Sequence, residues 1–478
     1  PKPSAAEVAL AAGVTDEQLK EMEIYRQRSR DKKRQPNDQL AEEVTMLLTV
    51  AEDAEPGKRE LRFLTESAMS NPIWLHVGQW PELRENEPND LESNEGIDAL
   101  PVVINGQIMP GDVDRFSFEA QKGMKIVINV GARDVIPYLA DAVPGWFQAV
   151  LRLHDAKGKE VAYNDDFRFD PDPALYFEVP ADGDYVLSIN EALFRGRESF
   201  TYRITIGELP FVTSIFPLGG RVGEPVNLEM DGWNLENAKL VPPTKDAKPG
   251  VHQVTAKTDE FVSNTMPFAL DTLPECFDEE SNDDAQHAQK VQLPIIVNGR
   301  MDGPNDWDIF EVQGNAGDTL VAEVQARRLD SPVDSFLKVT DAQGKVLAFN
   351  DDHHDAASGL NTHHADSYLM VKLPSNGTYF VHMGDTTRKG GKEYGYRLRI
   401  SPPRPDFELR VVPPNLSIRG KSSASVSVYA LRKDGFDGAI KIEFKDLPKG
   451  LVSKPVTLAA GKDVTRIGVK ATSTGRNE

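Results

Sequence analysis

One acidic motif organises this chain, and it reads Glu85-Asn86-Glu87-Pro88-Asn89-Asp90. A second version, Asp278-Glu279-Glu280-Ser281-Asn282-Asp283, follows 193 residues later. Each version is followed by the same series of short markers: Leu-Pro, Asn-Gly, Asp-x-Asp-x-Phe, Asn-Asp-Asp, Gly-x-Tyr and a last Tyr. In chain order these are Leu100-Pro101, Asn105-Gly106, Asp112–Phe116, Asn164–Asp166, Gly183–Tyr185 and Tyr202, and then Leu293-Pro294, Asn298-Gly299, Asp306–Phe310, Asn350–Asp352, Gly377–Tyr379 and Tyr396. A repeat of this length predicts two copies of one folded module.

Composition limits the classes of protein to consider. With 478 residues, several domains are expected. The formal charge of -21 argues against nucleic acid or an anionic membrane as the main partner. The single cysteine, Cys276, excludes an internal disulfide framework and a Cys-rich zinc site. No apolar run reaches the roughly 18 residues of a membrane-spanning helix, so we expect no transmembrane segment.

The hydrophobic pattern predicts strands. Polar and apolar residues alternate in Lys125–Val130, Tyr185–Ile189 and Tyr202–Ile206, as they do in half-buried strands. Gly and Pro interrupt such runs at intervals of about ten residues, which is typical of β-sandwiches. We therefore expect an all-β fold of tandem β-sandwich modules, jelly rolls for the repeats and Ig-like sandwiches between them, with a short N-terminal helical segment.

Composition breaks and the repeat offset place the predicted boundaries. They give a helical segment at 1–45, incomplete Ig-like strands at 46–80, a first repeat at 81–208, an Ig-like domain at 209–271, a second repeat at 272–403 and an Ig-like sandwich at 404–478. Ser4 with Glu7 matches the capping-box spacing that begins helices. Strands are expected over 45–50, 59–64 and 72–77, too few for an independent domain. Because the chain begins at Pro1 rather than Met, a processed or trimmed amino terminus is expected.

Each repeat carries an insert of its own. The first, Val135–Phe147, is unusually apolar for a loop, and it either forms a ligand platform or covers one end of the sandwich. The second contains His353, His354, His363 and His364. Four histidines so close together suggest a transition-metal site. A polar, flexible loop explains them as well, because no helical spacing fixes their geometry.

The repeated unit resembles the bacterial pre-peptidase C-terminal domain. The resemblance is carried by Glu87–Asp90, Asn105-Gly106, Gly111–Phe116, Asn164–Asp166, Gly183–Tyr185 and their counterparts in the second copy. The second copy departs from the family at Ser281, where Pro is usual, and at Asp278, which replaces Glu85. Residues 210–235 resemble the IPT/TIG type of Ig-like domain. The alternation of modules is similar to that of long secreted proteins of planctomycete bacteria.

The resemblance implies a calcium site at the entrance of each repeat. Carried over by position, the implied ligands are Glu85, Glu87, Asn89, Asp90, Asp112 and Asp114 in the first copy, and Asp278, Glu280, Asn282, Asp283, Asp306 and Asp308 in the second. Calcium binds six to eight oxygen ligands, which carboxylates and amides supply. Asn and Asp also favour turns, so these residues, like the Asn-Asp-Asp triplets, could simply shape the backbone.

No catalytic signature accompanies these acids. The sequence contains no Gly-x-Ser-x-Gly, His-Glu-x-x-His, phosphate-binding Gly-rich loop or Cys-x-x-Cys motif, and we predict that the chain is not an enzyme. Paired carboxylates can hydrolyse glycosides, but acids clustered at a domain entrance are better placed as metal ligands. One hypothesis is a non-catalytic binding or structural protein, located outside the cell, on its surface or in the periplasm, whose partner is a surface or matrix protein or polysaccharide. The other is the accessory region of a secreted peptidase or other hydrolase whose catalytic domain lies outside these residues.

Overall fold

The computed structural model describes residues 46–64, 70, 72–89, 95–135, 147–197, 199–354, 363–413, 416, 418 and 421–472. Contacts divide the chain into two units, Pro1–Glu55 and Pro56–Glu478. In the first unit, residues 46–55 form neither strand nor helix. The strand expected over 45–50 is therefore wrong for 46–50, where Leu47 and Val50 are exposed and no strand among the described residues pairs with them. The predicted helical segment at 1–45 lies outside the described residues.

The second unit is built of strands. Its one described helix is the single 3-10 turn η1 (Arg327–Leu329). The predicted all-β fold of β-sandwich modules is thus confirmed. Within the described ranges, no helix combines the length and apolar character that crossing a lipid bilayer requires.

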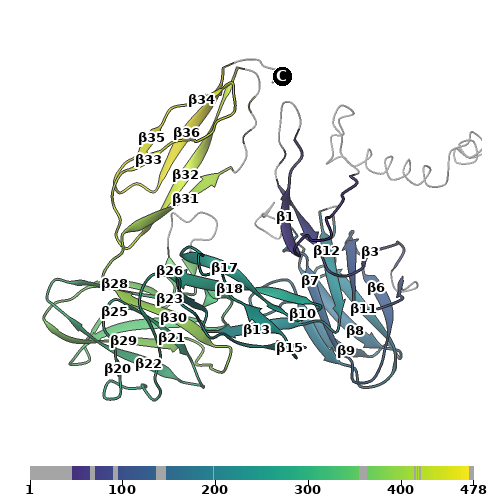
Figure 1. Cartoon of the computed structure of the whole chain (residues 1–478), viewed down its shortest axis with the longest axis horizontal. Helices are drawn as coiled ribbons and strands as arrows, with labels where there is room; N and C mark the ends of the chain where they lie inside the picture. Colours follow the sequence, from purple (N-terminus) through teal and green to yellow (C-terminus); the bar gives the residue numbers. More distant parts are fainter. Residues whose placement is uncertain are drawn as a thin grey trace, which may run out of the picture. The chain divides into compact units, whose positions relative to one another are not determined.

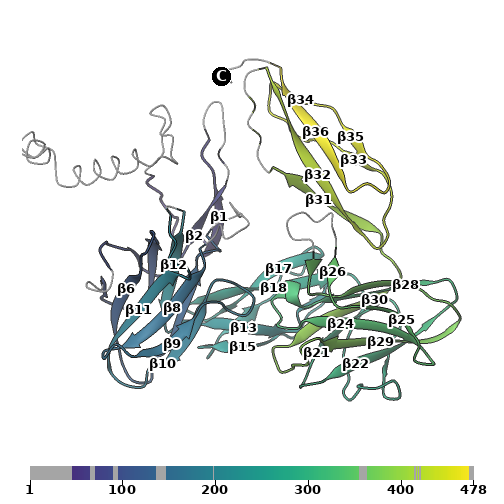
Figure 2. The same cartoon turned by 180° about the vertical axis from the view of Figure 1, so that it is seen from behind.

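The first large sandwich contains two five-stranded sheets (Figures 1 and 2). One sheet has the order β10 (Ala174–Glu178), β7 (Lys125–Gly131), β12 (Thr201–Gly207), β5 (Val102–Gln107) and β3 (Glu82–Arg84). The other has the order β4 (Glu95–Ile97), β6 (Asp114–Ala120), β11 (Gly183–Glu191), β8 (Ala149–Asp155) and β9 (Glu160–Asn164).

Alternation along the strands builds the core of this sandwich. In β6 every second side chain is buried, starting at Asp114 and continuing with Phe116 and Phe118, because successive residues of a strand point to opposite faces. Phe147, at the end of the apolar insert, is fully buried and stacks on Phe200 with ring centres 5.6 Å apart. This end of the insert therefore packs into the core, and residues 136–146 lie outside the described ranges.

The second large sandwich has the same strand order. One sheet has the order β28 (Tyr368–Lys372), β23 (Thr319–Gln325), β30 (Gly395–Ser401), β21 (Ile295–Arg300) and β19 (Glu275–Phe277). The other has the order β20 (Gln289–Lys290), β22 (Trp307–Gly314), β29 (Gly377–Asp385), β24 (Ser335–Asp341) and β25 (Val346–Asn350). The four histidines lie in a two-stranded ribbon of β26 (His353–His354) and β27 (His363–His364). These four residues therefore lie in paired strands and not in a loop.

Two smaller sandwiches also belong to this unit. In the first, β13 (Phe211–Phe216) and β15 (Glu229–Trp233) form a separate sheet beside that of β14 (Gly219–Arg221), β18 (Val262–Asp271), β17 (Gly250–Lys257) and β16 (Lys239–Val241). In the second, the sheet of β31 (Asp406–Val412), β32 (Ser423–Lys433), β36 (Val464–Ala471) and β34 (Leu451–Ser453) accompanies the pair β33 (Ile440–Ile442) and β35 (Val456–Leu458).

A lone hairpin, β1 (Gly57–Leu61) with β2 (Ile73–Val77), precedes the first large sandwich. Gly57 lies opposite Val77 and Leu61 opposite Ile73. In the β17–β18 hairpin, Gly250 lies opposite Leu270 and Val254 opposite Met266, so every partner is shifted by 193 residues. Gly57 and Gly250 also have nearly equal positive φ angles, 138° and 137°. The hairpin β1–β2 is thus a structural counterpart of β17–β18.

Candidate metal centres

A backbone hydrogen bond fastens each acidic motif to the start of a core strand. The carbonyl oxygen of Asn89 accepts the Arg115 N–H at 2.8 Å, and that of Asn282 accepts the Ile309 N–H at 3.1 Å. Asp114 and Asp308, the neighbours of these donors on β6 and β22, are both fully buried. The motif and the buried carboxylate are therefore held side by side in both sandwiches.

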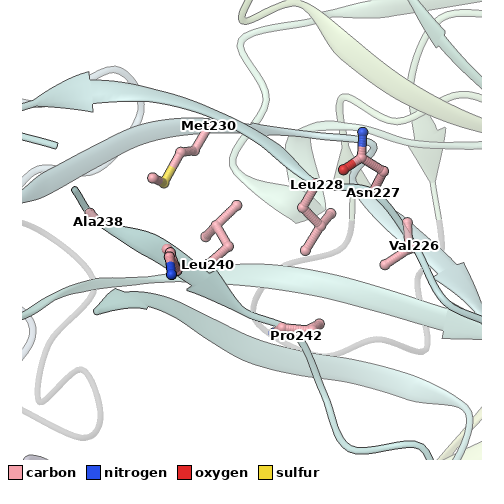
Figure 3. Close-up of a pocket in the computed structure, with 8 residues that line it drawn as sticks. Val226, Asn227, Leu228, Met230, Ala238, Leu240 and Pro242 are labelled. Atoms are coloured by element: carbon pink, nitrogen blue, oxygen red, sulfur yellow. The ribbon is translucent and has the colours of Figure 1, made fainter. Parts of the chain in front are cut away.

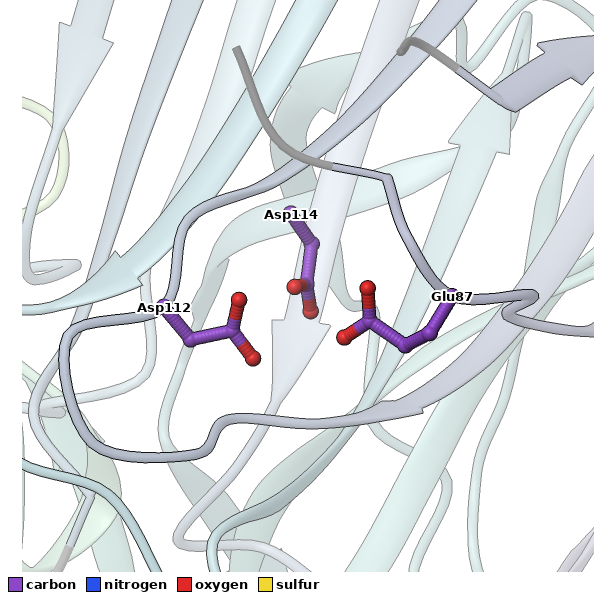
Figure 4. Close-up of side chains that lie close together, drawn as sticks. All are labelled: Glu87, Asp112 and Asp114. Atoms are coloured by element: carbon purple, nitrogen blue, oxygen red, sulfur yellow. The ribbon is translucent and has the colours of Figure 1, made fainter. Parts of the chain in front are cut away.

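The first cluster joins Glu87, Asp112 and Asp114 (Figure 4). One carboxylate oxygen from each of them lies within 4.8 Å of the others. Asp112 also accepts the backbone N–H of Met109 at 3.1 Å, which fixes the turn before β6. Three negative charges converging at this distance repel one another unless protons or a cation intervene.

A buried tyrosine closes the inner side of this cluster. The Tyr202 hydroxyl lies within hydrogen-bonding distance of both Asp114 and Glu85, the latter at 2.7 Å. A hydroxyl has one proton to donate, so the second contact requires a proton on a carboxyl group. Burial, above all, together with the charge of Glu85 raises the pKa of Asp114 to about 9. Without a cation, this site therefore retains a proton at neutral pH.

The Asn89 side chain is fully buried beside the carboxylates. In one amide orientation its nitrogen donates to Asp114 at 3.1 Å and to Glu87 at 3.2 Å. In the other orientation its oxygen faces the same two carboxylate oxygens. The second orientation is favourable only when a cation or a carboxyl proton lies between these oxygens, so the amide can accommodate more than one state of the cluster.

The second cluster joins Asp278, Glu280 and Asp308 within the same 4.8 Å. Oδ2 of Asp308 accepts the hydroxyl of Tyr396 at 2.7 Å, whereas Oδ1 has no hydrogen-bond partner. Neither polar atom of the fully buried Asn282 side chain has a partner. Buried polar atoms are seldom left unpaired, and each one costs about 1–3 kcal/mol. The arrangement lacks a group that would bind these oxygens.

Electrostatics in the second cluster favour the same conclusion. Burial, with the charges of Asp306 and Asp278, raises the pKa of Glu280 to about 7. Burial also raises the pKa of Asp278 to about 6 and that of Asp308 well above its usual value. Carboxylates that are crowded and buried in this way are poised to exchange protons for a cation.

The predicted ligands divide into those that converge and those that do not. Glu87 with Asp114, and Glu280 with Asp308, meet in both copies, but the third acid is Asp112 in the first and Asp278 in the second. Glu85 binds the Gln107 N–H and Tyr202 instead. Asp283 and Asp306 bind the backbone N–H groups of Trp307 and Asp302. Asp90 lies outside the described residues. The triplet residue Asn350 shapes a turn by binding the Asp352 carbonyl and the Tyr368 N–H.

Sequence reasoning missed Tyr202 and Tyr396 as site residues. Their signal was present, because both mark the repeat, and each lies opposite the glycine of an Asn-Gly pair. A Cβ atom on Gly106 or Gly299 would come within 2.2 Å of the tyrosine hydroxyl. The Asn-Gly pairs are thus the places where the tyrosine ring crosses the neighbouring strand.

A pocket of about 370 Å³ lies in the first small sandwich, remote in sequence from both clusters (Figure 3). Six of its eight lining residues are apolar, including Leu228, Met230 and Leu240, and its polar side chains are Asn227 and Lys239. The lining contains no acidic residue, histidine or cysteine.

Comparisons with known proteins give partial matches. No protein-family model matches the chain. Over 81 residues the chain is 44% identical to a probable subtilase-type serine protease of Deinococcus radiodurans, a match that covers 17% of this chain and 10% of that protein. Among solved structures, the pre-peptidase C-terminal domain of a Bacillus anthracis collagenase matches at 18% identity and a TM-score of 0.17, over 26% of this chain and 99% of that domain. A periplasmic inhibitor of g-type lysozyme from Salmonella Typhimurium matches at 16% identity and a TM-score of 0.16, over 27% of this chain and 96% of the inhibitor. The chain therefore spans about a tenth of the length of its curated relative.

Proposed function

We propose that each large sandwich binds one calcium ion at its acidic cluster, and that the chain is a non-catalytic, calcium-stabilised part of a secreted or cell-surface protein. The ion would be held by Glu87, Asn89, Asp112 and Asp114 in the first sandwich. In the second it would be held by Asp278, Glu280, Asn282 and Asp308.

The unpaired buried oxygens of Asn282 and Asp308 carry this proposal. Both side chains are fully buried beside further carboxylates, so water does not readily replace the missing partner. The donors are all oxygens, which suits a hard cation such as calcium, whereas zinc in proteins prefers nitrogen and sulfur. Ordinary turn residues would have no reason to bury an unpaired carboxylate oxygen.

A bound ion would neutralise the cluster and link two parts of the chain. The acidic motif leads into each sandwich, and Asp114 and Asp308 are the first residue of β6 and the second residue of β22. Binding at both places would fix the entrance segment against the sandwich. The modules would then present their surfaces rigidly to a partner, which we propose to be a protein or polysaccharide of the cell surface or matrix.

A second candidate is supported by the relative from Deinococcus radiodurans. That protein is a probable subtilase-type protease, and it shares 44% identity over 81 residues. The shared part would be an accessory module, and this chain the accessory region of a secreted hydrolase. The intact mass of the native protein separates the two candidates. A mass near 52.9 kDa would exclude an attached catalytic domain.

Thermal unfolding and titration calorimetry test the calcium sites. Extracellular modules bind calcium with Kd values of about 10⁻⁴–10⁻³ M. At ten times Kd, an ion that binds only the folded state adds about 1.4 kcal/mol of stability per site. We expect two calcium ions per chain and a higher melting temperature with calcium than with magnesium or chelator. Identical melting curves in all three buffers would refute the proposal.

A further inference from the structure

The histidine ribbon places two imidazole rings next to each other across a strand pair. His353 lies directly opposite His364 in the antiparallel register of β26 and β27. Directly opposite side chains project from the same face, with Cβ atoms about 4.5–5.5 Å apart. The two ring centres are 5.0 Å apart and their planes are inclined by 38°. The backbone therefore supplies the fixed geometry that sequence spacing did not.

A chain of contacts orients the His353 ring. The Tyr368 ring packs against it edge-on, with centres 5.2 Å apart. The Tyr368 hydroxyl donates to Asp434 at 3.0 Å, and Asp434 is held in turn by Arg399 at 2.7 Å. Outer contacts of this kind restrict the orientation of ligand side chains and reduce the loss of side-chain entropy on binding.

The His364 ring has an unused ligand atom. Its Nδ1 is buried and has no hydrogen-bond partner. Burial, and then the positive charge of Arg328, lowers the pKa of His364, while Asp366 opposes this effect. A neutral imidazole nitrogen is the form that binds metals.

We propose that His353 and His364 form a two-imidazole site for Zn²⁺ on this face of the ribbon. Two imidazole nitrogens bound at about 2.0–2.1 Å to one tetrahedral ion place their ring centres about 5 Å apart, which matches the observed separation. Water or a ligand from a partner fills the other positions. The site goes beyond the calcium clusters, because imidazole suits zinc and calcium prefers oxygen.

Zinc bound here joins the two strands of the ribbon that connects β25 to β28. It would fasten β26 to β27 next to Tyr368, which contacts Asp434 of the last small sandwich. Two protein ligands leave the ion partly open, so the site also has room for a donor from another molecule.

Calorimetric titration of the tag-free full chain with zinc chloride, in excess calcium to occupy the acidic clusters, tests the proposal. We expect one zinc ion per chain. His353→Ala and His364→Ala should each weaken binding by at least about tenfold, since even outer-shell changes cost 10–100-fold. His252→Ala is the matched control, because that histidine lies in the first small sandwich and binds the Lys248 carbonyl. It should bind zinc as the unmutated chain does.

A second measurement counts the nitrogen ligands directly. With Cu²⁺ in place of zinc, the electron paramagnetic resonance spectrum should show coupling to two imidazole nitrogens, and to one in either variant. Unchanged calcium-dependent melting would show that the variants are folded. Absence of stoichiometric zinc binding, binding that survives both substitutions, or loss only in His354→Ala on the opposite face would overturn the site.

Discussion

Tyr396 donates its buried hydroxyl to Asp308 at 2.7 Å, and the bond joins the two sheets of the second large sandwich. Tyr202 and Asp114 form the corresponding bond in the first. Each tyrosine binds one oxygen of a carboxylate near the start of a core strand. In the second sandwich the other oxygen, Asp308 Oδ1, has no partner. The tyrosine thus holds the carboxylate with one oxygen committed and one available to an ion.

Removing one acid should abolish the calcium response of one sandwich only. In Glu280→Ala, calorimetry should count one calcium ion instead of two, because a converging ligand of the second cluster is lost. Glu279→Ala removes the same charge from the neighbouring position, outside the cluster, and should retain both ions. If both variants bind two ions, Glu280 is not a ligand.

Calcium should stabilise the protein more as pH rises. The folded-state pKa values of Asp278, Glu280 and Asp114 are raised to about 6, 7 and 9, above their unfolded values near 4. At pH values between the unfolded and the folded pKa of each group, the folded, calcium-free protein binds more protons than the unfolded chain. The contribution of these groups to stability therefore falls as pH rises through that range. Calcium replaces those protons. The difference in melting temperature between calcium and calcium-free buffers should grow from pH 5 to pH 8, and calcium binding at pH 6 should release protons. A difference that shrinks over this range would contradict the protonated clusters.

Gly299→Ala should destabilise the second sandwich and impair its calcium site. The new methyl group would lie 2.2 Å from the Tyr396 hydroxyl, and Tyr396 is fully buried and cannot move aside. Overpacking of this kind costs about 1–3 kcal/mol. Urea unfolding should show the loss, and calorimetry a weaker second calcium site. Gly303→Ala, where the Cβ meets nothing within 4 Å, is the control.

The fold class could be predicted from the sequence because strand alternation is local. Phe116 and Phe118 mark a buried face in the printed sequence and are buried in the structure. The repeat also predicted that the acidic motif lies next to the start of a core strand. The structure brings Glu87 together with Asp114, and Glu280 together with Asp308.

Which of the predicted acids completes each cluster as its third member could not be predicted, because that depends on contacts distant in the chain. Glu85 is drawn to Tyr202, which lies 117 residues later on β12, in the sheet that also contains β3. Asp278 has the shorter side chain and joins the second cluster instead. The pairing of His353 with His364 was equally hidden, because it depends on the register of two very short strands.

The two sandwiches should differ in their dependence on a repeated arginine. Arg397 pairs with Glu275 and Asn298, and Arg203 pairs with Glu82 and Asn105 in the same way. The Arg397 side chain is 2% exposed, against 14% for Arg203, because Gly219 packs against its guanidinium group. Breaking a buried ion pair costs about 3–5 kcal/mol, since a charge is left unpaired. In urea, Arg397→Met should therefore lower the unfolding midpoint of its sandwich more than Arg203→Met lowers that of the other. Equal shifts would show that burial does not set the cost.

The β1–β2 hairpin should be the less stable of the two matched hairpins. Leu75 corresponds in position to Phe268, but Leu75 is half-buried and Phe268 is fully buried, because β17–β18 is flanked by β14 and β16. In the described part of the chain, no further strand pairs with β1 or β2. A two-stranded hairpin is at best marginally stable by itself, so its backbone amides should open at a much lower free energy.

Hydrogen exchange followed by mass spectrometry should show amides of 57–61 exchanging well before those of 250–254. Phe268→Ala should cost about 3–5 kcal/mol and Leu75→Ala clearly less, since the removed contacts are fewer. Equal protection of the two hairpins would mean that β1–β2 is covered in solution by a segment outside the described residues or by a partner.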